Sequence, residues 1–148
     1  VVEYNSRFGD PETQVVLPRL KTDIMDIFDA IENETLADLE IEWSDEASAC
    51  VIMASGGYPK SYKKGRAISG LVSGQMPGGE AEVFHAGTKK LADGTLVTNG
   101  GRVLGLSVTA DTLRGAIDGA YAAAEKISFE DMHYRRDIGA RALAAMEG

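Results

Sequence analysis

The chain has 148 residues, the size of one typical domain or of one domain with a remnant of a second. Its 44% hydrophobic and 26% charged residues exclude intrinsic disorder, because a chain of this apolar content can bury a core. A net charge of −8 argues against sequence-independent nucleic-acid binding, which requires cations that neutralise phosphates. No apolar run is long enough to cross a bilayer, and no secretion leader is visible. We therefore expect a cytoplasmic protein that binds neither nucleic acid nor membrane.

The chain opens without a methionine and directly on a strand-like pattern. Residues 1–7 alternate between apolar and polar side chains, and this period of two predicts a β-strand. Genuine N-termini are usually polar and frayed. We therefore expect a fragment of a longer polypeptide.

Two helices are predicted next. Asp10 followed by Pro11 is the pattern of an N-cap and a first helical residue, and it predicts a short helix over 12–17 that ends near Pro18. A second, amphipathic helix is expected to pack against a core, because apolar residues recur at helical spacing: Leu20, Ile24, Ile27, Phe28 and Ile31. Asn33-Glu34-Thr35 interrupts this pattern and marks the boundary between residues 1–35 and 36–148.

The second part, residues 36–148, is expected to be a small β-rich domain with one or two packed helices. Asp93-Gly94 predicts a hairpin, and Asp111 is expected to cap a helix from Thr112 to about Ile127. A final helix is predicted over 137–146. Strands or short extended segments are predicted over 41–43, 47–54, 67–71, 81–86, 95–98 and 102–109. The fold class is α+β.

A single cysteine, Cys50, excludes an internal disulfide and a zinc site built from several cysteines. It lies in an apolar run, which favours a small buried hydrophobic residue over a nucleophile.

Three polar side chains of the predicted first strand, Glu3, Asn5 and Arg7, would point to one face. A carboxylate and an amide oxygen are hard ligands that suit Mg²⁺ held partly by substrate phosphates. An arginine beside them can neutralise charge that develops on a transferring phosphoryl group. Taken alone, so short a pattern is more often an ordinary solvent-facing strand.

The residues that follow add features of an anion site. Gly9 lets backbone approach a ligand, and the start of a helix favours anions. Local rules favour a simple N-cap role for Asp10, and Glu12 can be explained by the helix dipole alone. Farther on, Gly100-Gly101-Arg102 offers backbone amides and a guanidinium for a substrate phosphate, and a glycine turn with a surface arginine is an equal alternative. The roles of His85 and Thr88 stay open.

Residues 3–14, Glu-Tyr-Asn-Ser-Arg-Phe-Gly-Asp-Pro-Glu-Thr-Gln, closely resemble the signature of the glycinamide ribonucleotide synthetase family, also called phosphoribosylamine–glycine ligases. Further blocks resemble that family in the same order over essentially the whole chain: residues 54–59, 83–88, 100–104 and 134–139.

The resemblance implies an ATP-grasp ligase of de novo purine biosynthesis. In that family ATP phosphorylates the carboxylate of glycine, and 5-phosphoribosylamine attacks the glycyl phosphate to give glycinamide ribonucleotide, ADP and phosphate. Residues 1–35 would then hold the last strand and helices of the ATP-grasp domain, and 36–148 would be the β-rich C-terminal domain.

The same resemblance assigns roles to single residues. Glu3 and Asn5 match the family's Mg²⁺ or Mn²⁺ ligands, and Arg7 matches its catalytic arginine near the transferring phosphoryl group. The loop that faces glycine and the ribosylamine is matched by Asp10, Pro11 and Glu12. Arg102 is a further candidate for substrate binding.

The family's N-terminal domain, adenine pocket and phosphate-covering loop have no counterpart in this sequence. We therefore expect the chain alone to be inactive and to need those portions of the same protein as its partner. A different ATP-grasp carboxylate ligase, such as a biotin-carboxylase-like or purine carboxylase/formyltransferase relative, would share the Glu-x-Asn-x-Arg pattern. A non-catalytic β-rich binding module is the third interpretation.

Overall fold

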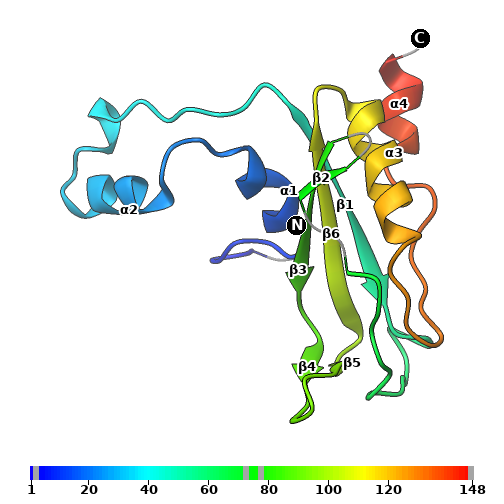
Figure 1. Ribbon diagram of the computed structural model, residues 1–148. Coiled ribbons are helices and arrows are strands. Elements are labelled where there is room, and N and C mark those ends of the chain that lie inside the picture. The colour runs from blue at the N-terminus through cyan, green and yellow to red at the C-terminus, as the bar shows by residue number, and fades with distance from the viewer. Residues whose placement is uncertain (2–3, 72–73, 77–78, 147–148) are drawn as a thin grey trace.

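The structure, a computed structural model, describes residues 1, 4–71, 74–76 and 79–146. An antiparallel sheet in the order β1-β6-β3-β2 forms its main body (Figure 1). These strands are β1 (Ala47–Ala54), β6 (Arg102–Ala110), β3 (Gly79–His85) and β2 (Gly74–Met76). A second ribbon pairs β4 (Thr88–Lys90) with β5 (Leu96–Thr98) beyond one end of the sheet.

The main core lies between this sheet and helix α3 (Leu113–Ala124), which packs on β1 and β6. Alternate strand residues point toward the helix and are fully buried, among them Val51, Met53, Leu104 and Leu106. Apart from Ile117, the buried residues of α3 are alanine and glycine, so the helix can lie close to the sheet. Helix α4 (Ala140–Met146) follows near the end of the chain.

The opposite face of β1 and β6 carries α1 (Thr13–Val16) and the 3₁₀ turn η1 (Leu17–Arg19). The Ser107 hydroxyl on β6 donates a hydrogen bond to the Gln14 carbonyl and so fastens α1 to the sheet. Cys50 pairs with Ser107 across β1 and β6 and is buried on the same face. The prediction of a buried cysteine is confirmed.

Residues 20–43, called the arm below, leave the sheet and project to one side (Figure 1). The arm holds α2 (Ile24–Glu32) and the 3₁₀ turn η2 (Leu36–Asp38). At its base the Ser44 N–H donates to the Arg19 carbonyl at 2.7 Å, and Arg19 Nη2 donates to the Ser44 carbonyl at 3.0 Å. The two ends of the arm therefore lie side by side.

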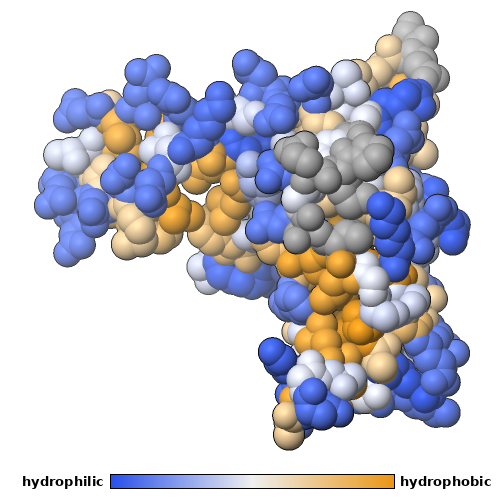
Figure 2. Space-filling view, viewed as in Figure 1, coloured by the Kyte–Doolittle hydropathy of each residue, from blue (hydrophilic) through white to orange (hydrophobic). Residues whose placement is uncertain are grey.

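Helix α2 is amphipathic, as the spacing predicts, but it does not pack against the core of the sheet. It begins at Ile24, later than the pattern from Leu20 suggests, because the Asp23 carboxylate caps it. Within α2, every residue of which is described, only Ala30 is buried. The side chains of Phe28 and Ile31 are exposed, and apolar residues show on the arm's surface (Figure 2).

Two predicted strands do not form among the described residues. Of residues 1–7 the described ones, 1 and 4–7, form no strand, because a strand needs a neighbouring strand for its hydrogen bonds and no described strand pairs with them. The segment 41–43 contributes only a bridge between Trp43 and Leu20. A third segment, 67–71, is reduced to isolated bridges at Ala67 and Ser69.

The other elements agree closely with the sequence. The strand over 47–54 is confirmed, as are the hairpin at Asp93-Gly94, a long helix after Thr112 and a last helix. The α+β class is confirmed as a small mixed domain with antiparallel sheets. The assignment of residues 1–35 to an ATP-grasp domain stays a prediction.

Candidate functional site

Three glycine-rich segments meet at the end of the sheet where β1 and β3 finish and β6 begins. The Ser55 N–H and hydroxyl donate to the Gly101 and Gly100 carbonyls, each at 2.8 Å. The Gly87 N–H donates to the Arg102 carbonyl at 2.9 Å. We call this arrangement, Ser55, Gly87 and Gly100–Arg102, the glycine corner.

Glycine is required in this corner because backbone and ring atoms come very close. A Cβ on Gly87 would lie 2.5 Å from the Gly100 Cα, and a Cβ on Gly101 would lie 2.1 Å from a ring carbon of Tyr58. Both distances are shorter than any ordinary carbon–carbon contact. One structural role is therefore common to three sequence blocks, because together they form the glycine corner: residues 54–59, 83–88 and 100–104.

The corner directs Arg102 toward the N-terminal segment. Met53 pairs with Leu104, but Ala54 pairs with Arg102, so the register shifts by one residue at Val103. A shift of this kind releases a residue from the two-residue alternation of the strand. Leu104 is buried beneath α3, whereas the Arg102 guanidinium reaches Asp10, just before α1.

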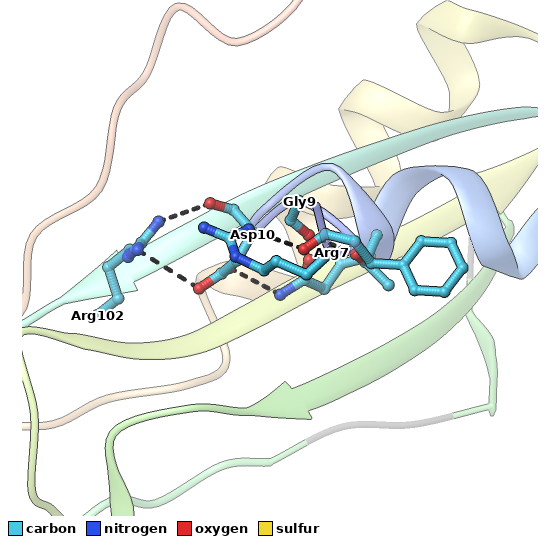
Figure 3. Close-up of polar contacts among 7 residues, drawn as sticks. Arg7, Gly9, Asp10 and Arg102 are labelled. Carbon is cyan, nitrogen blue, oxygen red and sulfur yellow. Dashed lines mark hydrogen bonds and ion pairs between the residues drawn. The ribbon is translucent and has the colours of Figure 1, made fainter. Parts of the chain in front are cut away.

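Asp10 is held by two side chains (Figure 3). Arg102 Nη1 donates to the Asp10 carbonyl at 2.8 Å, and Arg102 Nη2 lies 3.5 Å from Asp10 Oδ2. Gln14 Nε2 donates to Asp10 Oδ1 at 2.9 Å. The N-cap role expected for Asp10 is wrong, because α1 begins only at Thr13 and the carboxylate is engaged by Gln14 and Arg102.

The other predicted site residues lie farther along the same segment. Arg7 is exposed, and its Nη1 donates to the carbonyl of its neighbour Phe8 at 2.7 Å. Asn5 and Glu12 are also exposed, and Pro11 is half-buried. Glu3 lies outside the described residues. The structure thus joins Asp10 to Arg102, two residues 92 positions apart, and leaves Asn5 and Arg7 facing solvent.

Two further groups of polar side chains lie outside this segment. His85 ends β3 and Thr88 begins β4, and His85 Nδ1 and Thr88 Oγ1 lie 3.2 Å apart at an exposed position. Lys60, Lys63, Lys64 and Arg66 form a basic cluster, in which Arg66 is paired with Glu130 at 2.6 Å. Acidic and basic side chains together line a cavity of about 270 Å³ beside them, so this cavity does not favour a phosphate. Its charged lining residues are Lys63, Arg66, Glu130 and Asp131.

Within the described part of the chain, no group of three or more His, Cys, Asp or Glu residues is placed to hold a metal ion. Across the same residues, no helix is long and apolar enough to span a membrane. A metal held jointly with substrate phosphates needs fewer than three protein ligands. The assignment of Glu3 and Asn5 as metal ligands therefore stays a prediction.

Comparison with known proteins identifies the family. Residues 48–141 match the family model described as phosphoribosylglycinamide synthetase, C domain. A phosphoribosylamine–glycine ligase from Caldanaerobacter subterraneus is 50% identical over 140 residues, which cover 95% of this chain and 32% of that protein. One from Synechocystis is 47% identical over 144 residues, 97% of this chain and 34% of that protein.

A solved structure agrees with these sequence matches. The crystal structure of the phosphoribosylamine–glycine ligase from Thermotoga maritima superposes with a TM-score of 0.71 at 36% identity, covering 93% of this chain and 32% of that one. The chain thus spans about a third of the length of the relatives it matches. Since the family model covers more than half of its residues, the chain belongs to the phosphoribosylglycinamide synthetase C-domain family.

Proposed function

We propose that this chain is the C-terminal portion of a phosphoribosylamine–glycine ligase, active when joined to the rest of that polypeptide. The names of its relatives support this activity. The observation that carries the proposal is the contact between Asp10 and Arg102, because it brings the signature segment onto the glycine corner. Two sequence blocks that resemble the same enzyme family thereby form one site.

The reaction needs two group transfers. A glycine carboxylate oxygen attacks the γ-phosphorus of ATP and ADP leaves, which gives glycyl phosphate. The amine of 5-phosphoribosylamine then attacks the acyl carbon, an amide forms, and phosphate and a proton leave. Both steps develop negative charge on phosphoryl oxygens. Positively charged groups that are fixed in place before the reaction lower the activation free energy of each step.

In this proposal Glu3 and Asn5 hold Mg²⁺ or Mn²⁺. The donors fit the ion, because carboxylate and amide oxygens are the hard ligands that these cations prefer, and Asn5 is exposed to an incoming nucleotide. When bound, the cation would neutralise the nucleotide phosphates. Arg7, two residues after Asn5, is also exposed and would place its guanidinium near the transferred phosphoryl group.

Asp10, Pro11 and Glu12 would face glycine and the ribosylamine. Carboxylates accept hydrogen bonds from ammonium groups and sugar hydroxyls, and both substrates carry such donors. The Asp10 and Arg102 side chains are each about 40% exposed, so this edge of the corner is open to a small molecule.

The remainder of the ligase would also cover the arm. Residues 20–43 carry eight acidic residues and one lysine, which accounts for nearly all of the net charge of −8. The same arm exposes large apolar side chains: Met25, Phe28, Ile31, Leu36, Ile41 and Trp43. An apolar groove with a basic rim on the ATP-grasp portion would fit this surface. Residues 1–35 would then belong to that portion, and the chain alone would be inactive.

The activity is tested in the complete ligase with the substitution Asn5→Ala. Loss of one hard ligand should raise the Mg²⁺ concentration for half-maximal rate by about tenfold or more and lower kcat. The measurement is ADP formation that depends on both glycine and ribosylamine. Asn5→Asp retains an oxygen ligand and is the matched control. An unchanged metal requirement in Asn5→Ala would contradict the ligand assignment, and absence of glycine-dependent turnover in the unaltered ligase would contradict the function.

A further inference from the structure

Residues 10–14, called the anchored segment below, are fastened to strand β6 at both ends. At one end Arg102 Nη1 donates to the Asp10 carbonyl at 2.8 Å. At the other end the Ser107 hydroxyl donates to the Gln14 carbonyl. Both contacts go to backbone atoms, so they fix the course of the chain whatever side chains the segment carries.

We propose that Arg102 is a positioning residue, which holds the Asp10-Pro11-Glu12 loop at the edge of the sheet for the amine-bearing substrates. This inference rests on the proposed function, and it differs from direct binding of a substrate phosphate by Arg102. The guanidinium already directs two of its nitrogens at Asp10 (Figure 3). A planar fork of donors matches a carbonyl and a carboxylate of the same residue better than a point charge does.

The glycine corner fixes the other end of Arg102. Its carbonyl accepts from the Gly87 N–H at 2.9 Å, and its neighbour Gly101 packs against the Tyr58 ring. The arginine backbone is therefore held by the corner while its side chain holds the loop. Gln14 completes the arrangement, since its Nε2 orients the Asp10 carboxylate from the other side.

Cys50 provides a reporter for the anchored segment. It is the chain's single cysteine, it is buried, and it lies directly across from Ser107, whose hydroxyl binds the Gln14 carbonyl. A thiol reagent can reach it on this face when the segment lifts from the sheet. The rate of Cys50 modification therefore measures how often the segment opens.

The first experiment uses the 148-residue chain and a neutral aromatic disulfide under native conditions. Arg102→Met keeps an unbranched stem and removes every donor, and we expect it to raise the Cys50 reaction rate by about tenfold. Arg102→Lys, with one donor group, should give a smaller rise. Asp10→Asn retains the carbonyl contact and should also change the rate less than Arg102→Met.

The matched control is Arg135→Met, which breaks an exposed arginine–aspartate pair with Asp137 at 2.8 Å away from the anchored segment. Its Cys50 rate should equal that of the wild type. Circular dichroism and the midpoint of urea unfolding check that each variant folds. If Arg102→Met does not fold, the comparison is made with Arg102→Lys instead. A wild-type Cys50 rate in a folded Arg102 variant would overturn the proposal.

The second experiment uses the complete ligase. A positioning role predicts that Arg102→Met lowers kcat/KM for glycine and for the ribosylamine together by about tenfold, while KM for ATP changes less than about twofold, and that Arg102→Lys partly restores the rate. A loss confined to KM for the ribosylamine, with an unchanged Cys50 rate, would show direct phosphate binding and overturn the proposal. If the ligase shows no such activity, the proposed function fails and the Cys50 rates still decide whether Arg102 holds the segment.

Discussion

At the residue scale, Cys50 shows how the anchored segment changes the chemistry of one side chain. Burial raises the pKa of the Cys50 thiol above its ordinary value of 9.0, the neighbouring Ser107 hydroxyl partly opposes this rise, and the negative charge of Asp10 adds to it. The thiol is therefore kept neutral where an exposed cysteine would begin to ionise. This environment explains why the residue packs as a small hydrophobic group.

The shifted pKa has a consequence for stability in alkali. Because the folded state disfavours the thiolate, Cys50 contributes stability that is fully present well below pH 9 and is lost as the pH rises and the unfolded chain ionises first. We expect the difference in unfolding free energy between wild type and Cys50→Ala to shrink between pH 8 and about pH 10.5. Urea titrations at each pH measure it. A difference that stays constant over this range would contradict the neutral thiol.

At the element scale, helix α3 depends on a side-chain cap one residue later than the sequence pattern suggests. Thr112, rather than Asp111, is the N-cap, since its hydroxyl accepts a hydrogen bond from the Gly115 N–H at 3.0 Å. Thr112→Ala should cost about 1 kcal/mol of unfolding free energy, while Thr112→Ser retains the acceptor and should cost less. Urea denaturation compares the two. Equal stability of both variants would show that the cap contributes nothing.

The elements also show what a sequence pattern can and cannot predict. The strand over 47–54 and helix α3 are set by local apolar periodicity and glycine turns, so they were predictable. Strand β2 has no such pattern and forms only through its pairing with β3. Conversely, residues 1–7 have the pattern of a strand, but the described ones have no strand beside them.

The candidate site also has features that the sequence predicts and features that it does not. Asp10 and Arg102 were each recognisable from their motifs, yet nothing in the spacing of residues 92 positions apart predicts that they touch. Their contact depends on the register shift at Val103 and on the close backbone approach of Gly87 and Gly100. These are properties of the paired strands. The sequence of one segment alone does not predict them.

At the scale of the whole molecule, the chain has two regions that differ in how much apolar surface they bury. The sheet and α3 share a continuous buried core, whereas the arm projects from it and its two ends are held to each other by the contacts of Arg19 with Ser44 and of Leu20 with Trp43 at its base. Local stability follows the amount of buried apolar contact, so the arm should exchange its amides sooner than β6. The arm's acidic charge and exposed apolar groups fit a surface that is covered in a longer polypeptide.

A pair of phenylalanines tests whether the arm is covered in the complete ligase. Phe28 on α2 is 44% exposed, and Phe129 in the core is 7% exposed. In the 148-residue chain, Phe28→Ala should change the unfolding free energy by less than about 0.5 kcal/mol, whereas Phe129→Ala should cost about 3 kcal/mol. In the complete ligase both substitutions should be costly, because the proposed contact with the ATP-grasp portion would bury Phe28. Thermal and urea unfolding of both proteins give the comparison. If Phe28→Ala stayed neutral in the complete ligase, the arm would be free there as well, and another partner would have to cover it.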